Sequence, residues 1–294
     1  MQLLTYNIQY CLGRDGRFDC QRIVDTIRGA DVIALQEVER FWTRSQDMDQ
    51  ARLIADAMPD YYWMFGPTID VLKSDEAPAP GQVDNRRRQF GNMVLSRFPI
   101  LSSRNHLLPK YTDPLRFAIQ RGVLEATIAT SHGPIRVLST HLCHLSETQR
   151  LRQVESILQI HTRARADGAV HSGEPPAAWG AEQVTPVRPP RSAVLMGDFN
   201  MQPHSAEYAR LLADPPPVED DPEPPARFVD AWMQAGCDPA RGATLYSDPL
   251  ARKGIRIDFC FVTEDLAPRV HTVEVDEEAA GSDHQPVKVR LALP

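Results

Sequence analysis

The chain has 294 residues and a formal net charge of −7, with 42% hydrophobic and 24% charged residues. This composition is typical of a globular protein and excludes disordered and fibrous classes. The negative charge argues against non-specific binding to nucleic acid, which usually requires a basic face. No apolar run reaches the ~18 residues of a membrane span, and the first residues lack the pattern of a secretory signal. We therefore expect a cytoplasmic protein without a membrane span.

The N-terminal part of the chain alternates predicted strands and helices. Leu3–Tyr10 has strand composition, and Asp19–Arg28 has one apolar helical face. Val32–Leu35 is a short apolar run of the kind that is buried in a sheet. Asp47–Met58 is predicted to be a helix, and Pro59 ends it.

The rest of the chain contains more predicted strands than helices. The strands are expected at Tyr61–Phe65, Asn92–Leu95, Gly122–Ala129, Ile135–Thr140, Ala193–Met196, Ile257–Val262, Val270–Val275 and Val287–Leu293. The helices are expected at Ser146–Arg165, Ser205–Ala213 and Val229–Gly236. Because strands often follow each other directly, mixed sheets fit better than a strictly alternating parallel sheet.

Three segments interrupt this pattern. Residues 73–88, 167–191 and 214–227 are rich in Pro, Gly and charged residues. Such segments are typical of surface loops that lack a core of their own. We predict a single domain over residues 1–294 with loop insertions at these three places.

Polar residues recur at the ends of the apolar strands. They are Asn7, Glu37, His141, Asp198 with Asn200, Asp258, and Asp283 with His284. Each residue alone is weak evidence, because an aspartate at a strand end more often caps a helix or forms a turn. Together they offer oxygen ligands without a thiolate, which suits Mg²⁺ or Mn²⁺, and histidines for proton transfer.

The local motifs around these residues follow one another in a recognisable order. They are Thr5-Tyr6-Asn7-Ile8, Leu35-Gln36-Glu37, Ser139-Thr140-His141-Leu142, Gly197-Asp198-Phe199-Asn200, Arg256-Ile257-Asp258 and Ser282-Asp283-His284. In this order, and over nearly the whole chain, they resemble the endonuclease/exonuclease/phosphatase superfamily. The resemblance implies a four-layered α/β sandwich, as in pancreatic-type deoxyribonucleases: two mixed β-sheets face to face, with helices on the outside and the site at one edge.

The resemblance also implies a metal site with one or two Mg²⁺ or Mn²⁺ ions. Glu37 would be the principal ligand, and Asn7 would lie near the metal or a phosphate oxygen. Asp283 would join the metal-binding side of the site.

The remaining motif residues would carry the catalytic steps. Asp198 would orient or deprotonate the attacking water, and Asn200 would position the phosphate. His284, held in one tautomer by Asp258, would be the base or would stabilise the phosphate. His141 would present a second imidazole to the scissile phosphate.

Two further residues are candidates for contact with the substrate phosphate. Asn92 lies in a segment that resembles the family's G-N-x-x-L-S-R pattern, although a structural turn explains it equally well. Arg121 begins a predicted strand and would bind phosphate or form a surface ion pair. His144 is interpreted as a supporting or surface residue, and Arg86 to Arg88 as a solvated charge run that would otherwise contact an anionic substrate.

The sequence thus predicts a metal-dependent phosphoesterase that acts on a small-molecule, lipid-head-group or sugar phosphoester, whose partner is that anionic substrate. The alternative within enzymes is a nuclease, which should show a basic or aromatic surface for the nucleic-acid backbone. We expect no stable nucleic-acid partner, because the candidate insertions are acidic and rich in proline. A non-catalytic binding module on this fold is a remote alternative. The oligomeric state is left open.

Overall fold

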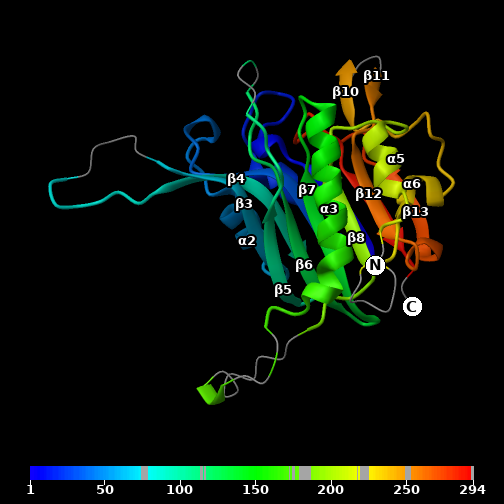
Figure 1. The fold of residues 1–294 in the computed structure, drawn as a ribbon. Coiled ribbons are helices and arrows are strands. Elements are labelled where there is room, and N and C mark those ends of the chain that lie inside the picture. The colour runs from blue at the N-terminus through cyan, green and yellow to red at the C-terminus, as the bar shows by residue number, and fades with distance from the viewer. Residues whose placement is uncertain are drawn as a thin grey trace.

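Two six-stranded β-sheets form the centre of the protein (Figure 1). The first sheet has the order β13-β14-β1-β2-β4-β3, and the second has the order β5-β6-β7-β8-β12-β9. β1 pairs with β2, and β7 with β8, in parallel, whereas the other neighbouring strands are antiparallel. Both sheets are therefore mixed, as predicted.

This computed structural model describes residues 1–73, 79–112, 115, 117–171, 173, 176–178, 187–216, 218, 225–248 and 253–292. The strands of the first sheet are β1 (Gln2–Asn7), β2 (Val32–Arg40), β3 (Tyr62–Leu72), β4 (Arg87–Ser96), β13 (Val270–Val275) and β14 (Val287–Leu291). Those of the second sheet are β5 (Ile100–Leu107), β6 (Gly122–Thr130), β7 (Gly133–His141), β8 (Ala193–Asp198), β9 (Phe228–Asp230) and β12 (Asp258–Thr263). A small separate sheet pairs β10 (Leu245–Asp248) with β11 (Lys253–Ile255).

The helices are short except for one. The α-helices are α1 (Cys20–Ile27), α2 (Gln50–Ala57), α3 (Glu147–Asp167), α5 (Ala206–Leu212) and α6 (Ala231–Gln234), and the 3₁₀ turns are η1 (Gln9–Cys11), η2 (Thr43–Ser45) and η3 (Ala267–Arg269). Side chains cap the four longest at their first residues, because the oxygens of Asp19, Asp49, Ser146 and Ser205 accept backbone N–H groups of the first turn. In the described residues, no helix has the length and apolar character to cross a membrane.

Three hydrophobic clusters separate four layers. One lies between the two sheets, one lies between the first sheet and α1 with α2, and one lies between the second sheet and α3 with α5. Successive side chains of a strand point to opposite faces of the sheet, so one strand contributes to two clusters. In β1, Leu3 faces the other sheet, while Leu4 faces the helices. Figure 1 shows α3 and α5 on the outer side of the second sheet. The predicted four-layered α/β sandwich is confirmed.

Several element bounds differ from the predictions. β1 ends at Asn7 instead of Tyr10, because Gln9, Tyr10 and Cys11 all have positive φ and form η1. The helix predicted at Val229–Gly236 is a short strand, β9, followed by α6. Strands β5, β10 and β11 were not predicted.

The predicted insertions fall partly outside the described residues. Residues 74–78 of the first, most of 172–186 in the second, and 217 and 219–224 in the third are not described. The described part of 73–88 continues the β3–β4 hairpin, which extends well beyond the sandwich in Figure 1. The single-domain organisation stays a prediction.

Candidate active site

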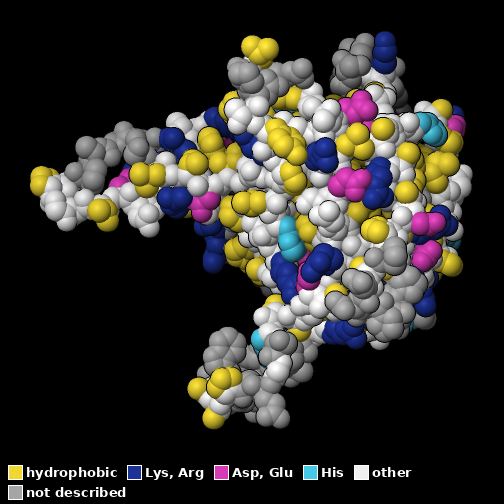
Figure 2. All heavy atoms as spheres, in the orientation of Figure 1, with side chains coloured by type: hydrophobic (Ala, Val, Ile, Leu, Met, Phe, Trp, Pro, Cys, Tyr) yellow, Lys and Arg dark blue, Asp and Glu magenta, His cyan; other side chains and the backbone are white. Residues whose placement is uncertain are grey.

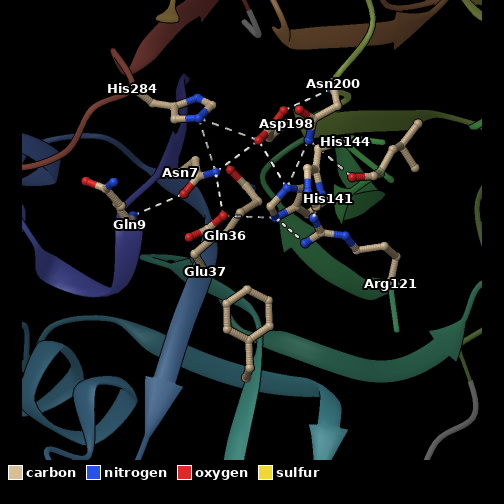
Figure 3. Close-up of polar contacts among 12 residues, drawn as sticks. Asn7, Gln9, Gln36, Glu37, Arg121, His141, His144, Asp198, Asn200 and His284 are labelled. Atoms are coloured by element: carbon tan, nitrogen blue, oxygen red, sulfur yellow. Dashed lines mark hydrogen bonds and ion pairs between the residues drawn. The ribbon is translucent and has the colours of Figure 1, made fainter. Parts of the chain in front are cut away.

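Strand direction brings the motif residues to one edge of the sandwich. Parallel strands end at the same edge, so Asn7 closes β1 while His141 and Asp198 close β7 and β8 as Cα partners. β12 is antiparallel to β8, and its first residue, Asp258, is the Cα partner of Asp198. His284 precedes β14, which is antiparallel to β1. Residues separated by most of the chain therefore meet at this edge (Figure 3).

Glu37 reaches the site from a bulge inside β2. Glu37 was predicted to lie at the end of this strand. The strand instead runs on to Arg40, with a register shift between Leu35 and Val38. Glu37 has a φ of 58°, which is rare for a residue with a side chain. At this bulge, Gln36 is buried and donates to Ser139 Oγ at 3.1 Å, while Glu37 lines the cavity.

The Asn7 amide links the two acids of the site. Its Nδ2 donates to Asp198 Oδ2 at 2.9 Å and to Glu37 Oε1 at 3.4 Å. Its Oδ1 accepts the backbone N–H of Gln9 at 3.0 Å, which fixes the direction of the amide. Burial raises the pKa of Glu37, although Arg121 and His284 oppose the shift. Burial also raises the pKa of Asp198.

His284 lies between two carboxylates. Its Nδ1 is 2.8 Å from Asp258 Oδ2, and its Nε2 is 3.7 Å from Asp198 Oδ2. Burial lowers the pKa of His284, but the charges of Asp258 and Asp198 outweigh it and raise the pKa to about 10. Because Nδ1 faces the carboxylate of Asp258, the ring is held with Nε2 toward the other site residues.

A second imidazole is oriented by Arg121. The guanidinium nitrogens of Arg121 lie 3.0 Å from His141 Nδ1 and 3.3 Å from His144 Nδ1. Since a guanidinium can only donate, both Nδ1 atoms act as acceptors, and both rings carry their proton on Nε2. Burial and the charge of Arg121 hold the pKa of His141 well below its usual range. His141 Nε2 then faces Asp198 Oδ2 at 3.2 Å.

Asn200 adds an amide beside this imidazole. Its backbone N–H donates to Asp198 Oδ1 at 2.9 Å, and its φ is 48°. Its Nδ2 donates to the Leu142 carbonyl at 3.2 Å and lies 3.1 Å from His141 Nε2.

Three predicted residues occupy other positions around this group. The Asp258 carboxylate lies 2.8 Å from His284 Nδ1, and Asp258 is not among the residues that line the cavity. Asp283 accepts Gln9 Nε2 at 2.9 Å and is not among the residues that line the cavity. Asn92 is buried between the sheets, where its Nδ2 donates to the carbonyls of Gly122 and Ser139, both at 3.1 Å. The structure thus gives Asn92 the contacts of a structural residue and does not bring it to the cavity.

A cavity of about 280 Å³ opens beside these groups. Its polar lining is formed by Glu37, Arg121, His141, His144, Asp198, Asn200 and His284. This volume is near the lower end of the ~300–1,000 Å³ typical of pockets for small molecules.

The donor set fits a divalent cation. Asp198 is buried and Glu37 is half-buried, and the Asn7 amide links the two acids. A cation beside them would favour their charged forms, which desolvation disfavours. A second arrangement, Asp198, Asp258 and His284, has ligand atoms within 4.8 Å of one another. We favour the Glu37 side, because Asp258 and His284 are already engaged with each other by a 2.8 Å hydrogen bond.

Comparison with known families agrees with this geometry. A sequence model described as the Endonuclease/Exonuclease/phosphatase family matches residues 4–284. The chain belongs to this family. Members of the family are hydrolases that act on phosphoesters and typically use divalent metals. No curated protein matches the sequence.

Solved structures of the family share the fold. An endonuclease/exonuclease/phosphatase from Beutenbergia cavernae is 22% identical, with a TM-score of 0.66 over 99% of this chain and 71% of that one. The mannosyl-6-phosphatase Bt3783 of Bacteroides thetaiotaomicron is 17% identical, with a TM-score of 0.66 over 100% of both chains. A humanized D. rerio TDP2 is 16% identical, with a TM-score of 0.61 over 100% of this chain and 99% of that one. At these identities the likeness concerns the fold alone.

Some residues of the site were not predicted. Gln9, which positions Asp283, is one of them. His144, interpreted from the sequence as a supporting or surface residue, accepts from Arg121 and lines the cavity. The cavity is also lined by Tyr10, Trp42, Arg44, Ile69, Phe90, Phe117 and Ile119, which the motifs do not include. The one available signal was proximity in sequence, since Tyr10 follows Asn7 closely and Trp42 follows Glu37.

Proposed function

We propose that this protein is a divalent-metal-dependent phosphoesterase that hydrolyses a P–O bond of a small-molecule, lipid-head-group or sugar phosphoester by in-line attack of water. One observation carries the proposal: buried Asp198 is surrounded by Asn7, His141 and His284 at the edge of a small cavity, with Glu37 linked to it through Asn7. This combination of acids, imidazoles and amides suits phosphoryl transfer from an ester to water.

The metal, Mg²⁺ or Mn²⁺, would be held by the Glu37 carboxylate, with Asp283 on the same side of the site and with Asn7 beside it, where the Asn7 amide N–H orients Glu37. When bound, it would offset the negative charge that develops on the equatorial and leaving oxygens. Glu37 supports this role by its burial and by its bulged, left-handed backbone, because such strain is kept where surrounding contacts enforce a functional position. Gln9 holds Asp283 by its 2.9 Å hydrogen bond.

The proton steps would belong to Asp198 and His284. Asp198 would orient the water and accept its proton, and its burial, which disfavours the charged form, makes it a better base than an exposed aspartate. His284, held by Asp258, would present its Nε2 to the phosphate as the stabilising group. We favour this over the role of base because two carboxylates face its ring.

The phosphate would be held on the other side by His141, Asn200 and Arg121. The Nε2–H of His141 is a donor, because Arg121 occupies Nδ1. Arg121 is buried and lines the same cavity, so its guanidinium lies close to an anion bound there. Removal of its charge should weaken binding of the phosphate and disturb the orientation of His141.

A metal-supplemented activity screen tests the proposal. The panel contains a simple bis-ester, a mono-ester, a phospholipid, RNA, and nicked and abasic DNA, each with Mg²⁺ or Mn²⁺ and again with chelator. We expect hydrolysis of at least one small ester that stops with chelator. No hydrolysis of any substrate with either metal, or hydrolysis that persists in metal-free enzyme with chelator, would contradict the proposal.

A further inference from the structure

The cavity beside the proposed catalytic residues has a second, apolar lining. It is formed by Tyr10, Trp42, Ile69, Phe90, Phe117 and Ile119, which we call the apolar wall. These residues come from η1, the segment before η2, strands β3 and β4, and the segment before β6. Aromatic and aliphatic side chains from five separate parts of the chain therefore border the same space as the phosphate-binding groups.

The part of the apolar wall around Trp42 is held in place by polar contacts outside it. Trp42 Nε1 donates to the Gln89 carbonyl at 2.8 Å, which fixes the indole ring. Arg44 Cζ lies 5.3 Å from the centre of the Trp42 ring and 4.6 Å from that of Tyr10. Arg44 is in turn paired with Glu39, whose side chain is fully buried. Such preorganised rings lose little freedom when a ligand packs on them.

The apolar wall runs from a buried floor to an exposed rim. Ile69 and Phe90 are Cα partners on β3 and β4, so their side chains lie on the same face of the sheet. Phe90 is 5% exposed and Phe117 is 84% exposed. Ordinary core packing explains a buried phenylalanine such as Phe90, but it does not explain Phe117, which lines the cavity while most of its surface faces solvent.

The chemistry of this lining favours one kind of substrate group. Sugar hydroxyls taken from water need hydrogen-bond partners, and an unpaired one is costly. Apart from the proposed phosphate site and His144, the side chains of the described lining residues offer such groups only at the Tyr10 hydroxyl and the Arg44 guanidinium. The Trp42 indole N–H does not count among them, because it is already bonded to the Gln89 carbonyl. An apolar ring gains free energy when it leaves water, and it packs well against other rings.

We propose that the substrate carries a flat apolar group of aryl type next to its phosphate, and that the apolar wall binds this group. The inference rests on the proposed phosphoesterase function, since the phosphate would occupy the polar half of the cavity. It narrows that function away from sugar phosphates and toward esters with an aromatic substituent.

Binding of phosphonates tests the apolar wall independently of turnover. In these compounds the substituent is attached by a P–C bond, so there is no P–O ester for the enzyme to hydrolyse. Isothermal titration calorimetry with Mn²⁺ present would compare methyl, phenyl and 2,3-dihydroxypropyl phosphonate. We expect phenyl phosphonate to bind at least about tenfold more tightly than the other two, the gain typical of burying one ring.

Two matched tryptophan variants locate the effect. In Trp42→Leu, the dissociation constant of methyl phosphonate divided by that of phenyl phosphonate should fall toward one. Trp63→Leu is the control, because Trp63 is 38% exposed on β3 and does not line the cavity. It should keep the wild-type ratio.

The outcomes separate this inference from the proposed function. If small esters are hydrolysed but phenyl phosphonate binds no more tightly than methyl or dihydroxypropyl phosphonate, or does not bind, the aryl inference is wrong and the phosphoesterase stands. A wild-type ratio in Trp42→Leu also contradicts it. If no phosphonate binds and no ester is hydrolysed with either metal, both proposals fail.

Discussion

Individual residues near the site adopt backbone conformations that side chains normally avoid. Gln9, Glu37 and Asn200 have φ values of 42°, 58° and 48°. Each left-handed residue with a side chain is disfavoured by roughly 1 kcal/mol or more and persists where the surroundings enforce it. Here each contacts another site residue: Gln9 bonds Asp283, Glu37 bonds Asn7, and Asn200 bonds Asp198. The strain therefore places polar groups that a regular strand would direct elsewhere.

Replacement of His284 tests the catalytic role of its imidazole. We expect His284→Ala to lower kcat by about 10²–10³-fold, the effect typical of removing one group that stabilises the charge developing in the transition state. Asp258→Asn should produce a smaller loss, because it disturbs the tautomer but leaves the ring. Steady-state kinetics on the best small ester measures both.

His271 provides the matched control, because it is an exposed histidine on β13. His271→Ala should keep wild-type turnover. If His284→Ala stays within a few-fold of wild type while circular dichroism shows it folded, the imidazole has no role in the reaction.

The identities of these residues could be predicted better than their geometry. Asp198 and His284 stand in specific motifs and Asn7 in a weaker one, and the order of all the motifs indicated that these residues share a site. Their mutual contacts depend on strand direction, and the position of Glu37 depends on a bulge that composition does not reveal. Asn92 had two equally supported interpretations, and two backbone acceptors between the sheets favour the structural one.

Among the elements, a buried ion pair joins β6 and β7, and Arg136 Nη1 of this pair also lies 3.3 Å from His161 Nδ1 on α3. Arg136 Nε donates to Glu125 Oε1 at 2.6 Å, and the two residues are 1% and 4% exposed. We expect Glu125→Gln to lower the free energy of unfolding by about 3–5 kcal/mol, because it leaves a buried guanidinium without its counter-charge. Urea unfolding at neutral pH measures this. A change below about 1 kcal/mol would show that the pair contributes little.

Glu125 and His161, which both contact Arg136, predict that the protein loses stability in acid in two steps. Burial and Arg136 lower the pKa of His161 to about 4, so the unfolded chain takes up its proton first and stability falls between pH ~6.5 and 4. Burial raises the pKa of Glu125, but His106 and Arg136 outweigh burial and lower this pKa to about 2. The contribution of Glu125 to the free energy of unfolding is therefore lost from pH ~4.5 downward.

Urea unfolding at several pH values separates the two steps. Glu125→Gln should retain the decline between pH ~6.5 and 4 if His161 remains buried and neutral, and should lose the further step below ~4.5. An unchanged profile below pH 4.5 in this variant would contradict the assignment of that step to Glu125.

Elements with strong patterns were predicted, and so were the edge strands β3 and β13, whereas the edge strand β5 was not. β1, β2 and β8 are buried almost throughout, so their apolar runs were visible in the sequence. β5 has mostly half-exposed and exposed residues and pairs only with β6, so it has little apolar signal. Backbone pairing, rather than side-chain burial, defines such an edge strand.

Over the whole molecule, the charge distribution favours small substrates. The net charge is −7, and among the described residues on the face in Figure 2, basic and acidic side chains are interspersed without a continuous basic band. A duplex carries one charge per ~1.7 Å of axis and is usually bound through many basic contacts. We expect faster hydrolysis of a small phosphoester than of plasmid, abasic or single-stranded DNA at equal phosphate concentration.

Initial rates at low and moderate salt check this preference. Small esters would bind at one pocket, so their hydrolysis should depend weakly on salt. Specific, salt-sensitive cleavage of DNA that is faster than hydrolysis of every small ester would instead identify a nuclease.

The fold as a whole explains why the site residues are spread from Asn7 to His284. Each sheet contributes strands that end at the same edge, so a site built there draws on both halves of the sandwich. Motif order was therefore a strong indicator of the fold. The cavity lining was not predictable, because Trp42, Phe90 and Phe117 are brought together by loops and by the β3–β4 hairpin.

The central claim, metal-dependent hydrolysis through Glu37, is tested most directly by turnover of Glu37→Gln with Mg²⁺ or Mn²⁺. The change removes the charge but keeps the size of the side chain, and Glu274→Gln, at an exposed position on β13, is the control. We predict that Glu37→Gln folds, with a circular dichroism spectrum like wild type, and loses turnover by about 10²-fold or more, while Glu274→Gln retains it. Full activity of folded Glu37→Gln at limiting metal would contradict the account.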